Sequence, residues 1–175
     1  MHGKLKLTSV SRSTPAMATA LPDLPMPETV MVRLLRIAIS SMTDYFEPVF
    51  RKIGLSENAF HVLCLLIAND TGSASPSELS ELVGTSRANM TRILERLVQE
   101  GLVSREFETR DARRHLIQVT AKGRQFTMSN VPNLAEPLRH AFSDLTPDEF
   151  AMLGTLLRKA ILSFDKGARP EPGNN

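Results

Sequence analysis

The stretch from Ser75 to Thr120 restricts the possible folds of this chain more than any other part. It opens with SPSE, in which a serine and a glutamate three residues apart have the spacing of a capping box, with proline at the first helical position. Gly84 ends the short helix that follows, and a second helix begins near Ser86 and ends at Gly101. Two short helices around a tight glycine turn predict a helix-turn-helix.

Two alternating segments follow at once. The residues of Leu102 to Phe107 and of His115 to Thr120 alternate between apolar and polar, which predicts two strands, and the connection ETRDARR gives the hairpin a basic tip. A helix-turn-helix followed directly by such a hairpin predicts a winged helix-turn-helix.

The rest of the chain reads as helices. Apolar residues at helical spacing predict a first helix over about 28–53, and Ser56 begins a second, almost wholly apolar one. A long helix is expected from Ala121, kinked or divided by Pro132 and Pro137, and a final one begins at the capping sequence TPDE. The predicted fold is therefore mainly α, a winged-helix lobe with a two-stranded wing joined to helices from both chain ends.

This reading also sets the expected domain boundaries. Residues 1–27 contain four prolines among small and polar residues, and the tail 167–175 has a similar composition, so both are expected to be disordered. Residues 28–166 are expected to form one domain, with the winged helix over about 56–120.

Charge and composition limit the function classes. The net charge is only +2, yet residues 85–124 hold nine basic and five acidic residues, so an affinity for nucleic acid must come from this local cluster. The single Cys64 excludes an intramolecular disulfide, and no apolar stretch has the length of a secretory or membrane segment, so the cytoplasm is expected. The four histidines lack metal-ligand spacing and no glycine-rich phosphate loop is present, so neither metal nor cofactor is expected.

The second helix of the predicted helix-turn-helix, here called the recognition helix, carries side chains on its polar face that are suited to contact base edges. Met90, Ile93, Leu94, Leu97 and Val98 form an apolar stripe that faces inward. The outward face then offers arginine for guanine and asparagine for adenine in the major groove of duplex DNA. The expected contacts from this helix are Ser86, Arg87, Asn89, Thr91 and Arg92.

The wing tip explains why one short segment concentrates three arginines around an aspartate. A guanidinium that enters the narrow, negative minor groove must be held in a fixed position, because ordering a free side chain costs entropy. Asp111 is expected to hold a neighbouring arginine or the turn, while Arg113 projects. Arg110 and Arg114 are expected to contact phosphates.

Taken together, these segments resemble the MarR family of transcriptional regulators over roughly 28–164. The resemblance rests on LSENAFHVLCLL, on PSELSELVGTSRANMTRILERLVQEGLV and on RDARRHLIQVTAKG. The last contains the wing signature, an aspartate and an arginine two residues apart before apolar alternation to Thr-x-x-Gly, here Asp111, Arg113, Thr120 and Gly123. The run from Pro76 to Gly101 is most similar to the EmrR-like branch of efflux-pump regulators.

The resemblance implies a homodimer joined by the first and last two helices, which binds a near-palindromic operator. It also implies a repressor released by a small aromatic acid, salicylate-like or hydroxynicotinate-like, bound in a crevice beside the DNA-binding lobe. The residues expected in such a crevice are Arg33, Arg36, Ser40, Tyr45 and His61.

Three alternatives stay open at this point. The winged helix can be a protein-interaction module whose basic tip only keeps it in solution. Cys64 can be a redox sensor, although the first helix lacks the cysteine that oxidant-sensing relatives carry, and Cys64 lies in an apolar run. Cys64 and His61 can be a nucleophile and its base, but no third orienting group is visible in the sequence.

Overall fold

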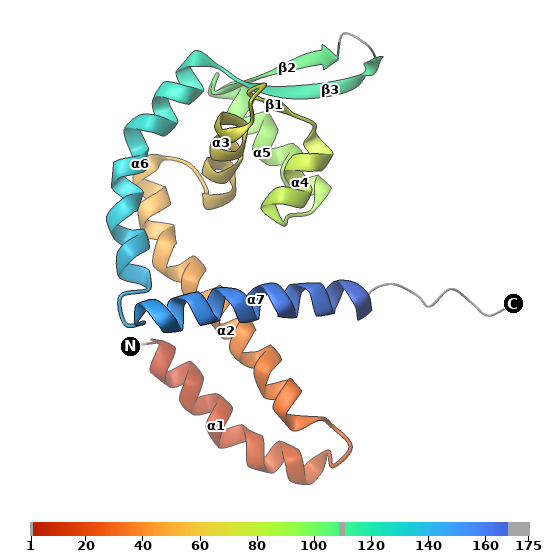
Figure 1. Ribbon diagram of the computed structural model, residues 1–175, viewed down its shortest axis with the longest axis vertical. Helices are drawn as coiled ribbons and strands as arrows, with labels where there is room; N and C mark the ends of the chain where they lie inside the picture. Colours follow the sequence, from red (N-terminus) through yellow and green to blue (C-terminus); the bar gives the residue numbers. More distant parts are fainter. Residues whose placement is uncertain (1, 109–110, 168–175) are drawn as a thin grey trace, which may run out of the picture. The chain divides into compact units, whose positions relative to one another are not determined.

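The computed structural model describes residues 2–108 and 111–167. They form helices α1 (His2–Ala20), α2 (Met26–Ile53), α3 (Glu57–Ala68), α4 (Pro76–Val83), α5 (Arg87–Gln99), α6 (Ala121–Ala141) and α7 (Pro147–Gly167). The strands are β1 (Ser73–Ala74), β2 (Val103–Glu108) and β3 (Asp111–Val119). The mainly helical winged-helix fold expected from the sequence is confirmed (Figure 1).

Local capping explains where most of these helices begin and end. Ser75 Oγ accepts a hydrogen bond from Glu78 N, and the Glu78 carboxylate accepts one from Ser75 N, so the predicted capping box starts α4. Ser86 Oγ caps α5 by accepting from Asn89 N at 3.2 Å. Gly54 and Gly84 end α2 and α4 with φ of 83° and 71°, values that glycine adopts without a steric penalty.

The three strands form one antiparallel sheet in the order β1-β3-β2. Strands β2 and β3 pair from Val103↔Val119 to Glu108↔Asp111, so both wing strands extend further toward the tip than the alternation predicted. Strand β1 is only two residues long and was not predicted from the sequence. It joins the free edge of β3, with Ser73 opposite Gln118.

Helices α3, α4 and α5 and the sheet share one core; together these elements (residues 57–119) are called the winged-helix lobe. Its most deeply buried side chains are completely inaccessible to solvent: Val62, Leu63, Leu66, Leu79, Leu97 and Ile117 are each 0% exposed. Four of the five residues of the predicted inward stripe of α5 are buried, the exception being Val98, which is 37% exposed.

The amino-terminal residues differ from the expected disordered arm, because residues 2–20 form helix α1. Most of its side chains are polar and stay in contact with solvent. One narrow face is buried, where Val10 is 5% exposed and packs toward α2. Lys6 and Ser13 also form hydrogen bonds with side chains of α2. Within α1, the hydroxyl groups of Thr8, Ser13 and Thr14 donate to backbone carbonyls. The expected disordered tail lies almost entirely at 168–175, outside the described residues.

Helix α6 runs without a break through Pro132 and Pro137, so these prolines do not divide it into two helices. The boundary between the two compact units of the chain nevertheless falls inside this helix, between Asn133 and Leu134. In the second unit, the Thr146–Glu149 capping box starts α7 as predicted, and the hydrogen bonds from Thr146 lower the pKa of the Glu149 carboxyl group. No helix within the described residues is long and apolar enough to cross a membrane.

Candidate nucleic-acid interface

Helix α5 has one buried apolar face and one solvent-exposed face that carries charged side chains. Met90 and Leu94 are each 1% exposed, whereas Arg87 and Arg92 are exposed. Because the buried side chains fix the rotation of the helix about its axis, both arginines stay on its exposed surface, about 140° apart around the axis. A helix with this arrangement can enter the major groove of duplex DNA.

The structure assigns different positions to the other residues predicted on α5. Ser86 acts as the helix cap, and the Thr91 hydroxyl donates to Arg87 O at 3.0 Å while the side chain remains exposed. Asn89 is half-buried, and its Nδ2 donates to Thr85 Oγ1 at 2.8 Å. The Asn89 side chain therefore connects α5 to the turn between α4 and α5 in this conformation. Arg87 and Arg92 are then the side chains most available to contact a base edge.

A hollow of about 610 Å³ lies beside this face, between the start of α4, the start of α5 and strand β3. Arg87 and Thr91 line it from α5, and Ser77 and Glu78 line it from α4. The N-terminus of α4 thus opens onto the same concave surface as the predicted base contacts. Such a surface can follow the backbone of a bound duplex.

The base of the wing is locked to the end of α5 by the predicted Thr-x-x-Gly signature. Thr120 Oγ1 donates to Gly101 O at 2.8 Å and accepts from Gly123 N at 2.9 Å. A Cβ atom at Gly123 would come within 2.0 Å of Leu102 O, so only glycine allows α6 to start this close to the turn. The signature thus fixes where the wing leaves the lobe.

The wing tip itself is only partly described. Asp111, Arg113 and Arg114 lie in β3 by their backbone, while the positions of their side chains, and Arg110 entirely, lie outside the described residues. Their roles in DNA binding stay predictions.

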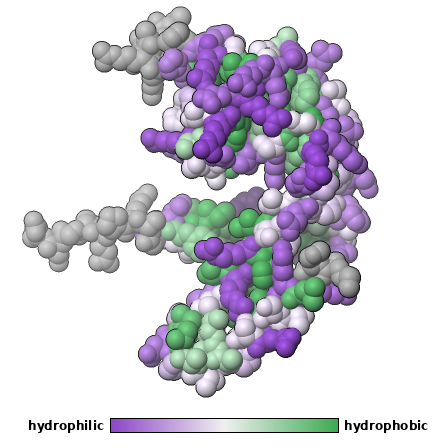
Figure 2. All heavy atoms as spheres, turned by 180° about the vertical axis from the view of Figure 1, so that it is seen from behind, coloured by the Kyte–Doolittle hydropathy of each residue, from purple (hydrophilic) through white to green (hydrophobic). Residues whose placement is uncertain are grey.

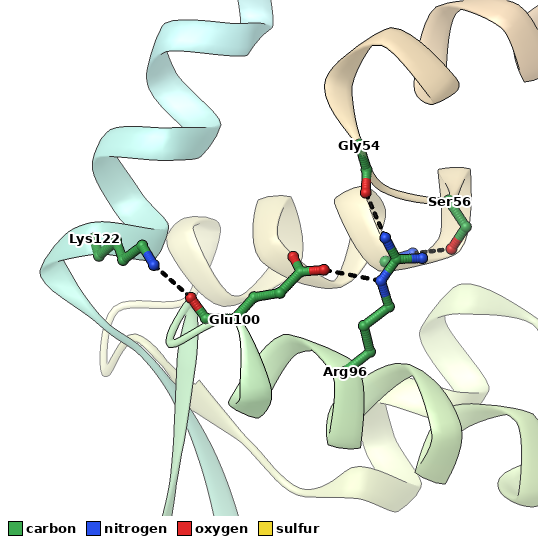
Figure 3. Close-up of polar contacts among 6 residues, drawn as sticks. Gly54, Ser56, Arg96, Glu100 and Lys122 are labelled. Atoms are coloured by element: carbon green, nitrogen blue, oxygen red, sulfur yellow. Dashed lines mark hydrogen bonds and ion pairs between the residues drawn. The ribbon is translucent and has the colours of Figure 1, made fainter.

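Arg96 has a structural role that the sequence reading missed. Its Nη2 donates to Gly54 O at 2.6 Å and its Nε to Glu100 Oε1 at 2.9 Å (Figure 3). Lys122 Nζ in turn donates to Glu100 O at 2.6 Å. These contacts join the end of α2, the end of α5 and the start of α6, so they fix the recognition helix relative to the helices on both sides of the lobe. The only local signal was the glutamate four residues after Arg96.

The residues predicted to bind an effector are not all brought together. Arg33 and Ser40 lie on the α2 face that α1 covers: Arg33 Nη2 donates to Ser13 Oγ at 2.8 Å, and Lys6 Nζ donates to Ser40 Oγ at 3.0 Å. Arg36 and Tyr45 are exposed on α2, and His61 is exposed on α3. Arg33 lies 20 residues before Ile53 on one helix, about 30 Å along its axis, and is therefore far from His61 within the chain.

Cys64 is half-buried on α3, and burial raises the pKa of its thiol. A raised pKa lowers the fraction of reactive thiolate at neutral pH. The redox alternative thus gains no support from the surroundings of Cys64.

Comparisons with known proteins agree with this geometry. The model of the MarR family matches residues 55–115. The chain is 30% identical to the transcriptional repressor MprA of Escherichia coli over 82% of each chain, and 32% identical to the transcriptional repressor YetL of Bacillus subtilis over 71% of this chain and 77% of YetL. Among solved structures, BpsR of Bordetella bronchiseptica, whose DNA binding is regulated by 6-hydroxynicotinic acid, superposes with a TM-score of 0.66 at 28% identity. That likeness covers 73% of this chain and 89% of BpsR.

The similarity to MprA fits the EmrR-like branch expected from the sequence, and these relatives are regulators rather than enzymes, which removes the Cys64–His61 enzyme alternative. The chain therefore belongs to the MarR family of winged-helix transcriptional regulators.

Proposed function

We propose that the protein is a homodimeric repressor that binds a pseudo-palindromic operator in duplex DNA and leaves it when a small aromatic acid binds. The observation that carries the DNA-binding part is the outward projection of Arg87 and Arg92 from a helix whose other face is locked into the core. The cytoplasm remains the proposed location of the protein.

Exposed apolar side chains support the dimer. On α7, Phe150, Leu156, Ile161 and Phe164 are 49 to 59% exposed, far more apolar surface than a helix of a small soluble monomer usually leaves to water (Figure 2). Pairing of two copies through such helices would present two recognition helices about one turn of DNA apart.

Three relatives support repression and an acid effector. MprA and YetL are both repressors, and BpsR responds to 6-hydroxynicotinic acid. A salicylate-like or hydroxynicotinate-like acid is therefore the proposed effector class. Arg33, Arg36, Ser40, Tyr45 and His61 remain the proposed contacts, with Arg36, Tyr45 and His61 exposed in the free chain.

The test is fluorescence anisotropy of a labelled duplex from upstream of the protein's own gene, at two salt concentrations, with a panel of aromatic acids. Arg92→Ala is expected to weaken specific binding by about 1–3 kcal/mol and to relax one base preference, because an arginine–guanine pair is lost. Arg113→Ala should cost a similar free energy, about 1–3 kcal/mol, at positions read in the minor groove.

Arg51→Gln is the matched control, since Arg51 is exposed on α2 and already paired with Glu47. Binding that does not weaken steeply with salt, or that survives Arg92→Ala unchanged, would instead favour the protein-interaction module, because counterion release accompanies contact with phosphates.

A further inference from the structure

The hydrogen bond between Asn89 and Thr85 uses only part of the Asn89 side-chain amide. Asn89 Nδ2 donates to Thr85 Oγ1 at 2.8 Å. A side-chain amide has two donor hydrogens and two acceptor lone pairs, so one hydrogen and the whole of Oδ1 remain for another partner. No described residue donates to this Oδ1, and Arg33 Nη1 is the one buried side-chain nitrogen or oxygen without a partner in the described part of the chain. Asn89 Oδ1 is therefore in contact with solvent.

Thr85 is a fixed support for this amide. Gly84 ends α4 with φ of 71°, and Thr85 N donates to Ser80 O at 3.0 Å, which holds the turn against the end of α4. Ser80 is itself only 5% exposed. A threonine side chain branches at Cβ and has few χ1 rotamers, so Thr85 Oγ1 keeps one position relative to the core of the winged-helix lobe.

The backbone of Asn89 is also held before any DNA binds. Asn89 N donates to Ser86 Oγ at 3.2 Å, and the next residue, Met90, is 1% exposed in the core. Both ends of the Asn89 side chain thus have partners in the free protein. A side chain that is ordered in advance loses less conformational entropy when it contacts a ligand.

The free groups of the Asn89 amide match one base. In the major groove, adenine presents the N6 amino donor beside the N7 acceptor, and an asparagine amide can bind both. This contact uses Oδ1 and the amide hydrogen beside it, and it leaves the second amide hydrogen for Thr85 Oγ1. Guanine presents two acceptors at the same edge and offers Oδ1 no donor. The bond to Thr85 and a two-point contact with adenine are therefore compatible.

We propose that Thr85 is a positioning residue for base recognition, which holds the Asn89 amide in the orientation that reads an adenine in the major groove. The proposal rests on the proposed operator binding and deepens it, because it names a base and a residue that acts through another. Asn89 and Arg92 are three residues apart on α5, about 4.5 Å along the axis and about 60° around it. The adenine should therefore be a close neighbour of the base that Arg92 is proposed to contact.

The test is in vitro selection, by the full chain, of duplexes from a library with a randomised central segment. Fluorescence anisotropy then gives the affinity for the selected duplex and for each of its single-base variants. Wild type should prefer adenine at one position of each half-site. Asn89→Ala should reduce that preference by about fivefold to 150-fold, the range for one two-point contact with a base, and should leave the preference at the other positions unchanged.

Thr85→Val is the decisive variant, because it removes the hydroxyl group and keeps the shape of the side chain. It should reduce the adenine preference by about twofold to tenfold, the value of one neutral hydrogen bond, without changing the salt dependence of binding. Thr85→Ser should restore most of the preference, and Thr85→Val should cause no further loss in the Asn89→Ala background. Thr19→Val is the matched control on α1, where the hydroxyl donates to Pro15 O at 3.1 Å, and it should change nothing.

Several outcomes would overturn the proposal. A Thr85→Val variant with the wild-type adenine preference would do so, and a stronger preference would show that Thr85 competes with DNA for Asn89. If Thr85 only stabilises the turn, Thr85→Val will weaken binding to all the duplexes equally and lower the melting temperature measured by circular dichroism, which also overturns it. Enrichment of a sequence without an adenine that depends on Asn89 would overturn the proposal alone. Failure of the wild type to enrich any sequence would overturn specific operator binding as well.

Discussion

In the winged-helix lobe, Leu79, Leu97 and Ile117 are completely buried, whereas on α7 Leu156, Ile161 and Leu162 are each more than half exposed. Both regions are rich in apolar residues, so composition alone does not separate them. The surface of the lobe is mainly polar, while apolar side chains lie along α7 (Figure 2). The lobe therefore closes its own core, whereas α7 leaves much of its apolar surface exposed.

The largest effect expected from this contrast is on folding stability. Leu97→Ala should lower the free energy of unfolding by about 2–5 kcal/mol, because it leaves a cavity in a closed core. Leu162→Ala, at a site that is 62% exposed, should cost less than about 0.5 kcal/mol in a monomeric state. Urea denaturation followed by circular dichroism at low protein concentration measures both. Equal costs would contradict the contrast.

Two glycines, one at the base of the wing and one on α7, extend this contrast to the backbone. Gly123→Ala should lower the free energy of unfolding by about 1–3 kcal/mol, since its Cβ would meet the carbonyl oxygen of Leu102. Gly154→Ala on α7 is the matched control, because its Cβ would meet only the end of the Arg158 side chain, which can move. Thermal melting distinguishes them: a stable Gly123→Ala variant would mean that the wing base is not rigid.

A glutamate introduced among the exposed apolar side chains of α7 tests whether a second copy of the protein buries that helix. Leu156→Glu should weaken the proposed dimer by about 1.5–3 kcal/mol, the value of burying one such side chain, while the lobe stays folded. Thr155→Glu places the same charge on an adjacent exposed position and should have a smaller effect. Sedimentation equilibrium gives both dimer constants. A wild-type protein that is monomeric, or a Leu156→Glu variant that dimerises as tightly as wild type, would contradict a dimer through α7.

The smallest expected effect concerns the Arg96 contacts between α2, α5 and α6. Arg96→Ala removes hydrogen bonds to Gly54 and Glu100, but the side chain is 55% exposed, so a cost of about 0.5–1.5 kcal/mol is expected. The reason is looser positioning of α5, so operator affinity and lobe stability should fall together. Arg92→Ala should instead lower affinity and leave urea denaturation unchanged. A variant of Arg96 that behaves like Arg92→Ala would assign Arg96 to direct DNA contact.

Much of the lobe could be predicted from short sequence patterns. The Ser75–Glu78 capping box, the glycine turn and the strand alternation each depend on residues within a few positions of one another, and the structure confirms all three. The two-residue strand β1 escaped prediction because it pairs with Gln118, more than 40 positions along the chain. Helix α1 was missed for a similar reason: its stabilising contacts, such as Lys6 with Ser40, join separate elements.

The candidate site divides in the same way. Periodicity correctly placed Arg87 and Arg92 on the outer face of α5, since the buried stripe fixes the opposite side. It also placed Asn89 there, and only the structure shows that its amide is bonded to Thr85. A polar side chain on the outer face can bond a neighbouring residue instead of DNA. Helical periodicity predicts the face of the side chain but not its hydrogen-bond partner.

Short sequence patterns were sufficient to predict the winged helix-turn-helix, its basic recognition helix and its family, because caps, turns and apolar periodicity act over one or two helical turns. Contacts between distant segments were needed to bring residues 2–20 against α2, to let Arg96 join three helices and to pair Arg33 with Ser13. The physical reason is that hydrogen-bond partners and burial at those positions depend on segments 20 to 42 residues away, which meet only once the chain has folded.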